Sequence, residues 1–331
     1  MIASAPPPRI RGALSLLALL LLLGALQGCL SQNATLTLPI SDWPGYESFH
    51  LAKEQGLDRS EQLELKLQTF PDPQDIVHAF LRGDLAMAQL TTVEAVDICA
   101  RVPKRCPVVV LVLDESVGGD QVVVRPEIRG IPDLRQRPVA VTPSTLGPYV
   151  LSRALQKHGL SLEDVQIRPM PLPGMATSLK RGEVMGAALF PPFSDAALRD
   201  GTARTVFTSR EIPGEIYDVL VVAPAFLVER PQEIARLLRV WQKAHDFAAD
   251  HPERAIAVMA EREGVTPTEF RRALEGLRFK PLARQQALFR RGGHLENNLR
   301  FLQQVQVKLG LMEPGPIPPV DPQPLRLALK R

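Results

Sequence analysis

Small hydroxyl residues follow a short apolar run between Val141 and Tyr149, which reads Val-Thr-Pro-Ser-Thr-Leu-Gly-Pro-Tyr. The pattern predicts a strand over 138–141 and a helix over about 146–158. Free backbone N–H groups and the positive end of the helix dipole would face outward where that helix starts. Ser144 and Thr145 can cap the helix or offer hydroxyls to a bound phosphate, sulfonate or carboxylate. A plain helix cap explains the same residues without a ligand.

Aromatic and hydroxyl side chains follow other predicted strands. Trp43 and Tyr46 come directly after the first strand and could stack on or cap a ligand, although core packing of a turn is an equal alternative. Thr91 and Thr92 open a predicted helix and could donate hydroxyls to a ligand, or could simply cap that helix. Phe190 could form an apolar side of a pocket, or belong to the core.

Two carboxylates stand where the chain pattern breaks. Glu115 and Asp218 lie at two predicted crossovers, and a carboxylate facing a cleft there would suit an amine or a ring N–H. The alternative for both is a solvated charge at a hinge.

Catalytic signatures are missing from the sequence after residue 28. There is no Walker loop, no His-Glu-x-x-His, no Gly-x-Ser-x-Gly and no glycine-rich dinucleotide fingerprint. The six histidines are scattered along the chain, and we interpret them as structural or exposed. We therefore expect a protein that is not an enzyme, with no cofactor and no metal.

Strands and helices must hold these residues in place. The sequence predicts that strands and helices alternate through two series. The first series covers residues 34–113 and the second covers 121–207, with glycine-containing breaks near 115–121 and 209–216. Alternation predicts an α/β fold with mostly parallel sheets flanked by helices. The breaks predict lobe 1 from residues 29–117 and 216–331, and lobe 2 from 118–215. Ligand sites on such sheets lie beyond the carboxyl ends of the strands.

The C-terminal third is predicted to be helical. Helices are expected over 231–250, 252–263, 267–276, 281–290 and 294–309, with proline or threonine signals at several starts. The proline-rich stretch 313–325 is expected to lie extended over the surface.

Residues 1–28 have the features of a secretory signal peptide. Arg9 and Arg11 precede an apolar run over 13–23, and Leu26-Gln27-Gly28-Cys29 follows. This ending resembles a bacterial lipobox, in which the cysteine is acylated after cleavage. We expect an exported protein anchored by lipid at Cys29; the alternative is an ordinary signal peptide with a chance cysteine.

Two further cysteines, Cys99 and Cys106, lie seven residues apart. A disulfide between them is plausible in an exported protein, and two free thiols are the alternative. Their spacing does not fit the usual zinc signatures.

The charge balance gives no sign of a polyanionic partner. The chain of 331 residues has 39 basic and 36 acidic residues, and removing 1–28 takes away two arginines, which leaves 37 − 36 = +1. No run of like charge stands out, so the sequence does not indicate nucleic acid binding.

Several segments together resemble one family. They are Ser41-Asp42-Trp43-Pro44-Gly45-Tyr46, residues 52–57, 82–88, 113–120 and 131–135. Their order and spacing are similar to those of extracytoplasmic solute-binding proteins of the nitrate, sulfonate and taurine class, which are related to binders of thiamine precursors. Two departures touch the expected pocket: Leu189-Phe190-Pro191-Pro192-Phe193 lacks an acidic residue, and Thr142-Pro143 replaces a turn glycine.

The resemblance implies a two-lobed fold of the periplasmic-binding-protein type (type II), with a hinge between the lobes. It implies a lipid-anchored receptor of an ABC importer that binds a small anionic or heteroaromatic solute in the cleft and delivers it to permease subunits. We expect a monomer at the periplasmic face of a bacterial membrane. The alternatives are a periplasmic ligand-sensing module and a pyrimidine-precursor-synthesising enzyme on the same fold.

Overall fold

The computed structural model describes residues 1–3, 33–199 and 201–330. Almost all of the predicted signal peptide, and Cys29 with it, lies outside the described residues. Among the helices that are described, none has the length and apolar character needed to cross a membrane.

The chain begins with a parallel pair of strands. These are β1 (Ala34–Ile40) and β2 (Leu63–Thr69), joined through α2 (Glu47–Glu54). Alternate side chains of β1 are buried because successive residues of a strand point to opposite faces. The Gln89 side chain donates to the Pro39 carbonyl over 3.1 Å and ties this pair to the next sheet.

A four-stranded sheet follows, in the order β11-β4-β10-β3. Its strands are β3 (Met87–Thr91), β4 (Val108–Ser116), β10 (Tyr217–Val222) and β11 (Leu277–Arg278). All nine residues of β4 are buried, as its continuous apolar run predicts.

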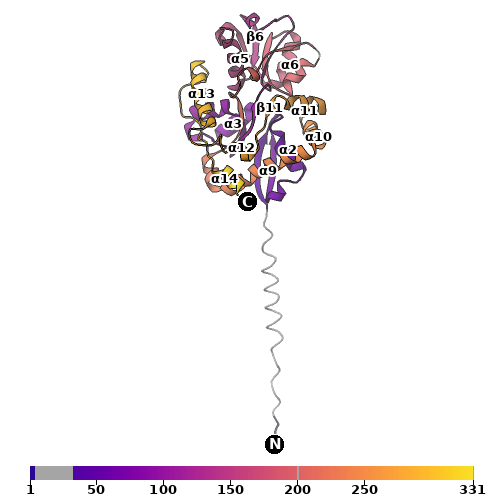
Figure 1. Ribbon diagram of the computed structural model, residues 1–331, viewed down its shortest axis with the longest axis vertical. Coiled ribbons are helices and arrows are strands. Elements are labelled where there is room, and N and C mark those ends of the chain that lie inside the picture. The colour runs from indigo at the N-terminus through magenta and orange to yellow at the C-terminus, as the bar shows by residue number, and fades with distance from the viewer. Residues whose placement is uncertain (4–32, 200, 331) are drawn as a thin grey trace.

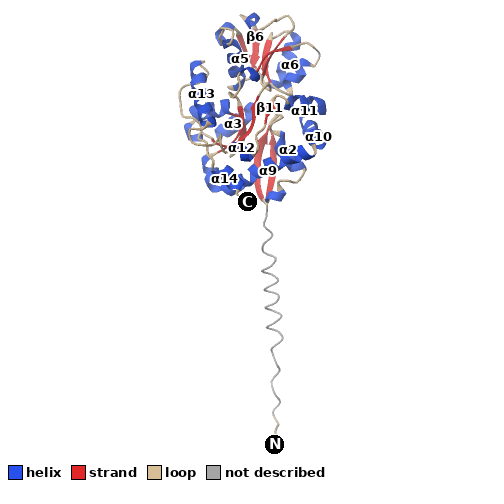
Figure 2. Cartoon of the chain, viewed as in Figure 1, coloured by secondary structure: helices blue, strands red, loops and turns tan. Residues whose placement is uncertain are grey.

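A five-stranded sheet comes from the middle of the chain, in the order β7-β6-β8-β5-β9. Its strands are β5 (Gln121–Val124), β6 (Pro138–Val141), β7 (Gln166–Pro169), β8 (Gly186–Leu189) and β9 (Arg204–Thr208). We call residues 121–208 the five-stranded part, and residues 34–116 with 217–330 the four-stranded part. Figure 2 shows their strands as two separate groups with helices around each.

The sheets are mixed, which corrects the expectation of mostly parallel sheets. Among the described strands, three pairings are parallel and five are antiparallel. Strand β10 runs antiparallel to both β3 and β4, and β5 runs antiparallel to both β8 and β9. Strands β5 and β10 are each the first strand after a crossover. The chain enters the sheet there at the edge where the neighbouring strands end, so the new strand runs in the opposite direction.

Helices cover both sheets. Those of the first half are α3 (Pro73–Arg82), α4 (Thr92–Arg101), α5 (Leu146–Gln156), α6 (Leu172–Arg181) and α7 (Phe193–Leu198). Those of the second half are α8 (Pro224–Glu229), α9 (Pro231–Asp250), α10 (Pro252–Glu263), α11 (Pro267–Leu274), α12 (Leu282–Gln285), α13 (His294–Lys308) and α14 (Gln323–Leu329). In Figure 1, α5 and α6 flank the five-stranded part, and α2, α9 and α14 lie at the far end of the molecule.

The helical C-terminal third agrees with the sequence in most of its boundaries. Helices α9 and α10 coincide with the predicted ranges, whereas the helix expected over 281–290 is a single turn, α12. The stretch expected to be extended over 313–325 turns into α14 at Gln323, where Pro322 and Pro324 are both compatible with a helix start. Leu325 and Ala328 of α14 are buried, so packing stabilises this short helix.

Two crossovers connect the two parts and run side by side. The Ser116 hydroxyl at the end of β4 lies 2.8 Å from the Ser209 hydroxyl, which follows β9. The Ser209 hydroxyl also accepts from the Gly118 backbone N–H over 2.7 Å. These short hydrogen bonds fix the two connections against each other at one place between the sheets.

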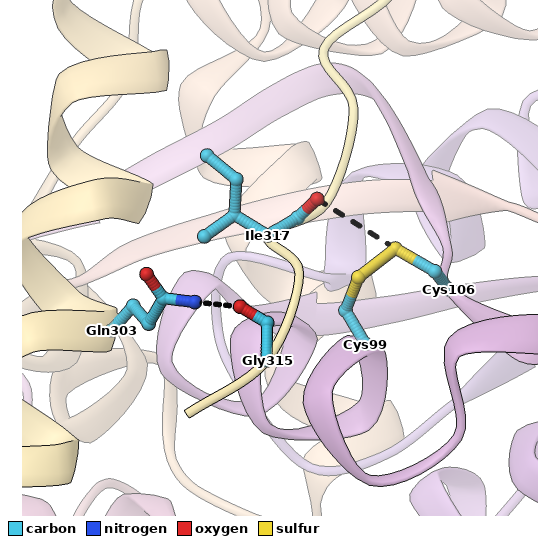
Figure 3. The surroundings of a disulfide bond; sticks show 5 residues. All are labelled: Cys99, Cys106, Gln303, Gly315 and Ile317. Carbon is cyan, nitrogen blue, oxygen red and sulfur yellow. Dashed lines mark hydrogen bonds between the residues drawn. A yellow bond between two sulfur atoms is a disulfide. The ribbon is translucent and has the colours of Figure 1, made fainter. Parts of the chain in front are cut away.

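Cys99 in α4 and Cys106, just before β4, form a disulfide (Figure 3). The Sγ atom of Cys106 lies 3.8 Å from the carbonyl oxygen of Ile317 in the extended C-terminal segment. The Gln303 side chain of α13 donates to the Gly315 carbonyl beside it. The disulfide therefore links α4 to β4 at the point where the C-terminal segment packs.

Candidate functional site

A cavity lies between the four-stranded and five-stranded parts, beside the crossovers. The space not filled by atoms measures about 610 Å³, part of it open to solvent, and the centres of water molecules can occupy about 40 Å³ of it. Its walls come from both parts of the chain, since they include the loop after β1, the starts of α3, α4 and α5, the end of β8 and the start of β10. The lining residues are Ser41, Trp43, Tyr46, Asp72, Pro73, Gln74, Thr91, Glu94, Asp120, Thr142, Ser144, Leu146, Gly147, Val150, Leu172, Ala188, Leu189, Phe190 and Asp218.

An aromatic wall closes one side of the cavity. Trp43 packs edge-on against Phe190, with ring centroids 5.3 Å apart, and edge-on against Tyr46 at 6.5 Å. Trp43 and Tyr46 belong to the four-stranded part, whereas Phe190 follows β8 of the five-stranded part. The wall therefore joins the two parts directly.

The start of α5 forms the opposite side. The Thr142 and Ser144 hydroxyls lie 2.8 Å apart and hydrogen-bond to each other. The side-chain cap expected from Ser144 or Thr145 is not formed. Thr145 is the N-cap residue, and its side chain makes no hydrogen bond to the first turn. Gly147 lets Thr142 approach, since a Cβ atom there would lie 2.6 Å from the Thr142 hydroxyl oxygen. Backbone N–H groups at this helix start are thus left without a side-chain cap.

A row of polar residues crosses the sheet at the floor of the cavity. Asp218 of β10 lies opposite Thr91 of β3 on one side and opposite Asp114 of β4 on the other. The Tyr46 hydroxyl donates to one Asp218 oxygen over 2.6 Å, and the Trp43 ring N–H donates to Asp114 over 3.3 Å. Asp218 and Asp114 are 2% and 0% exposed, so both carboxyl groups are out of contact with solvent.

Burial and proximity raise the pKa of both aspartates. Loss of hydration is the largest cause, and it raises the pKa of Asp114 to about 7 even though the hydrogen bond from Trp43 opposes it. The pKa of Asp218 is raised well above its ordinary value, first by burial and then by the negative charge of Asp114. The two groups hydrogen-bond to each other in a way that favours the proton on Asp218.

Gly45 makes room for this arrangement. A Cβ atom at residue 45 would lie 1.9 Å from an Asp114 carboxylate oxygen and 2.8 Å from the Trp43 ring nitrogen. Only a residue without a side chain lets the loop after β1 pass this close to the sheet floor.

Two more carboxylates complete the floor. Glu94, in the first turn of α4, accepts from the Thr91 hydroxyl over 2.8 Å in a capping box, and burial raises its pKa to about 7. Asp120 lies in the first crossover, and burial raises its pKa to about 6. One Asp120 oxygen, Oδ2, has no hydrogen-bond partner among the described residues. Among the described residues that line this cavity, none is a lysine, an arginine or a histidine.

Six of the nine residues that the sequence suggested for ligand binding lie together in the lining: Trp43, Tyr46, Thr91, Ser144, Phe190 and Asp218. The other three lie outside it. The Thr92 hydroxyl accepts from the Tyr217 backbone N–H over 3.2 Å, and Glu115 pairs with Arg278 and Lys280 at 3.2 and 3.5 Å. Thr145 occupies the N-cap of α5 without lining the cavity. The part each plays in binding stays a prediction.

Sequence reasoning missed several lining residues: Asp72, Gln74, Glu94 and Asp120. Glu94 had a readable signal, because Thr-Thr-Val-Glu has the spacing of a capping box that places the glutamate beside Thr91. Asp72 likewise precedes Pro73 at a helix start and caps α3 through the Gln74 backbone N–H at 3.0 Å. Nothing in the sequence distinguishes Asp120 from any other loop aspartate.

The model of one protein family matches residues 31–262, which is more than half of the chain and includes every lining residue. The chain belongs to the NMT1-like family. The resemblance stated from the sequence is confirmed.

Curated relatives and solved structures allow a comparison with individual proteins. This NMT1-like chain is 26% identical over 185 residues to the taurine-binding periplasmic protein of Escherichia coli K12, covering 56% of this chain and 51% of that one. The chain spans about half the length of the curated relatives it matches. The alkanesulfonate-binding protein SsuA of Xanthomonas axonopodis pv. citri, bound to MOPS, superposes with a TM-score of 0.72 at 16% identity, covering 85% of this chain and 95% of that chain.

The same fold also occurs in an enzyme. The desulfurization enzyme DSZB superposes with a TM-score of 0.61 at 19% identity, covering 85% of this chain and 94% of that chain. At these identities the structural likeness shows the fold alone. The α/β fold of the periplasmic-binding-protein type is therefore confirmed, and function must be argued from the cavity.

Proposed function

We propose that this NMT1-like chain is a solute-binding receptor of an ABC importer. The observation that carries the proposal is the cavity, whose walls come from both parts of the chain and meet beside the paired crossovers. A ligand placed there would contact both parts at once. Binding would then favour the arrangement in which the two parts are closed on it.

The crossovers are suited to act as the hinge. They connect residues 29–117 and 216–331, as one lobe, to residues 118–215, as the other. Gly118 has a φ of 139°, a conformation that favours glycine, and its N–H is held by Ser209 of the second crossover. Phe190 already lies against Trp43 in this structure, so opening about this point would separate the two rings and closure would seal the aromatic side of the cavity again.

Anchoring and delivery complete the proposed role. The signal peptide and the lipobox-like Leu26-Gln27-Gly28-Cys29 support export and acylation at Cys29. A lipid anchor would hold a monomeric receptor at the periplasmic face of the membrane, beside the permease subunits that recognise its closed form. Replacing Cys29 with alanine should move the protein from the membrane fraction to the soluble fraction of the cell. Persistence in the membrane fraction would contradict the anchor.

The solute class proposed from the family is a small anionic or heteroaromatic compound, such as a sulfonate, nitrate, taurine or a pyrimidine precursor of thiamine. Ligand-dependent melting against a panel of these compounds tests the receptor function. We expect at least one to raise the melting temperature, because a ligand that binds only the folded state stabilises it. Mass spectrometry of small molecules released on denaturation provides an independent identification.

A sensing module that transports nothing is the main alternative, and it uses the same cavity and the same closure. An enzyme is the less favoured alternative, supported only by the fold shared with DSZB. The described lining residues include no lysine and no histidine, the reactive pair that the enzyme alternative needs, which supports a binding function. Turnover of a bound compound by the purified protein would overturn that interpretation.

A further inference from the structure

The charges that line the cavity are all of one sign. Asp72, Glu94, Asp120 and Asp218 line it, and Asp114 lies directly behind Asp218. Asp72 is occupied as the cap of α3, and Glu94 is occupied by Thr91. Asp120 Oδ2 has no N–H or hydroxyl partner among the described residues, whereas Asp114 and Asp218 hydrogen-bond to each other through the proton on Asp218.

Buried carboxylates of this kind are costly without a partner, and the usual partners are absent from this part of the chain. Three basic side chains form ion pairs with other carboxylates instead. Arg278 and Lys280 pair with Glu115, and Arg153 pairs with Glu215 at 2.6 Å. A polar group that stays buried and unpaired in a folded protein calls for an explanation, and an external donor supplies one. Asp120 is 2% exposed and is one of the residues that line the cavity, so a molecule bound there would be a donor for its unpartnered oxygen.

The aromatic wall also suits a ligand that carries a positively charged donor group. The rings of Trp43, Tyr46 and Phe190 surround the carboxylates on one side. Aromatic faces attract organic cations through the ring quadrupole, and they also stack on flat heterocycles. A metal ion fits less well, because among the described residues no group of three or more His, Cys, Asp or Glu is arranged to hold one.

Resting on the proposed receptor function, we propose that the solute is a small organic cation. Its protonated nitrogen, as in an amine, an amidine or an aminated heterocycle, binds Asp218 and Asp120, and its apolar body lies against Trp43 and Phe190. Simple anions such as nitrate and alkanesulfonates without an amine are excluded.

The start of α5 does not reverse this conclusion. Its uncapped N–H groups contribute a positive charge equivalent to about half an elementary charge, and this effect is confined to the first turn. The carboxylates contribute up to several full negative charges across the same narrow cavity. The α5 start can therefore accept an oxygen or ring nitrogen of the ligand, but it does not neutralise the floor on which a free anion would have to lie.

Three probes of similar shape and different charge can show whether the cavity prefers a cation, a neutral molecule or an anion. Benzamidine is a cation, benzamide is its neutral analogue, and benzenesulfonate is an anion on the same ring. Taurine and nitrate are added as the family's own solutes. We expect benzamidine to raise the melting temperature most and benzamide less, with no effect of benzenesulfonate or nitrate. Stabilisation by benzenesulfonate or nitrate equal to or above that by benzamidine would overturn the cation inference and leave the receptor function standing. No response to any of the five would count against both.

Isosteric variants test the residues. Asp218→Asn and Asp120→Asn keep the side-chain shape and remove the acidic group, so neither side chain can ionise beside a bound cation. The amide oxygen at residue 218 can still accept from the Tyr46 hydroxyl. We expect each to weaken benzamidine binding at least about tenfold, because a buried charge partner is lost. Asp97→Asn is the control, since Asp97 is a buried carboxylate of α4 that pairs with Arg101 and does not line the cavity, and binding should stay unchanged. Equal affinity in all three variants would overturn the assignment.

Folding should not obscure this comparison, because each amide matches the shape of the buried acid that it replaces and cannot acquire an unpaired buried charge. Melting curves without ligand check this directly. The pH profile gives a second measure. The titratable groups that line or adjoin the cavity are Tyr46, Asp72, Glu94, Asp114, Asp120 and Asp218, and the cation should bind more tightly as the pH rises through the raised pKa values of about 6 and 7. An affinity that falls over this range would contradict the inference.

Discussion

The ring of Trp43 packs edge-on against the ring of Phe190 with centroids 5.3 Å apart, although the two residues are 147 positions apart in the chain and follow strands of different sheets. Trp43 also donates its ring N–H to Asp114, so one side chain contacts both the opposite part of the molecule and the carboxylate floor. This relationship couples the closing of the two parts to the position of the carboxylates. A cavity built in this way would respond as a unit to the solute it binds.

Removing one ring of the aromatic contact should weaken solute binding. Phe190→Ala removes the ring that packs on Trp43, and we expect affinity for a stabilising solute to fall about three- to tenfold, the range for an aromatic pair. Isothermal titration calorimetry measures this. Phe193→Ala is the control, because Phe193 packs against Phe190 at 5.8 Å without lining the cavity. If both variants bind as the parent protein does, the contact has no part in closure.

A methyl group at residue 45 should displace the carboxylate floor. Gly45→Ala places its Cβ atom 1.9 Å from Asp114, so the loop or the aspartate must move and solute binding should be lost. Gly174→Ala is the matched control, because nothing lies within 4 Å of a Cβ atom there and the residue is in helix α6. It should bind normally and be slightly more stable, since alanine favours a helix over glycine. Normal binding by the residue-45 variant would show that the floor tolerates the shift.

The buried carboxylates should make the ligand-free protein less stable as the pH rises. Their folded-state pKa values, about 7 for Glu94 and Asp114 and about 6 for Asp120, are above the ordinary values of 4.5 and 3.8. Between those limits the folded state still binds protons that the unfolded state has released. The free energy of unfolding therefore decreases from about pH 4 to pH 7 on account of these groups.

The Asp120→Asn variant isolates this effect. We expect its urea midpoint to fall less than that of the parent protein between pH 4.5 and pH 7.5, because one of the raised groups no longer titrates. The comparison is between two proteins at each pH, so carboxylates elsewhere contribute equally to both. Identical pH profiles would mean that Asp120 does not hold its proton in the folded state.

Removing the disulfide should destabilise the fold without altering the site. Cys99 and Cys106 close a short loop, for which chain entropy predicts a loss of about 2 to 3 kcal/mol in the free energy of unfolding. The bond lies beside Ile317 and the C-terminal segment, away from the lining residues (Figure 3). A Cys99→Ala, Cys106→Ala double variant, measured by chemical denaturation and by solute titration, should lose stability and keep its affinity. Loss of affinity alone would contradict this separation.

Local patterns in the sequence determined much of the fold. The alternation of apolar strands with helices, the glycine-containing breaks and the proline or threonine signals at helix starts predicted the elements and most of their boundaries, including α9 and α10. These signals are read over a few residues because capping, periodicity and turn formation are local effects. The same reasoning identified the loops after β1 and β6, which hold Trp43 and Ser144.

Only the tertiary structure decided which strands pair and which carboxylates meet. The register that sets Asp218 between Thr91 and Asp114 joins positions more than a hundred residues apart, and no local pattern encodes it. The antiparallel entry of β5 and β10 follows from the path of the crossovers, and the free oxygen of Asp120 follows from what surrounds it. Glu115, which is as acidic as its neighbours, is neutralised by Arg278 and Lys280, while Asp218 is not. Charge and burial are properties of the packed surroundings, so the nature of the site depends on the fold.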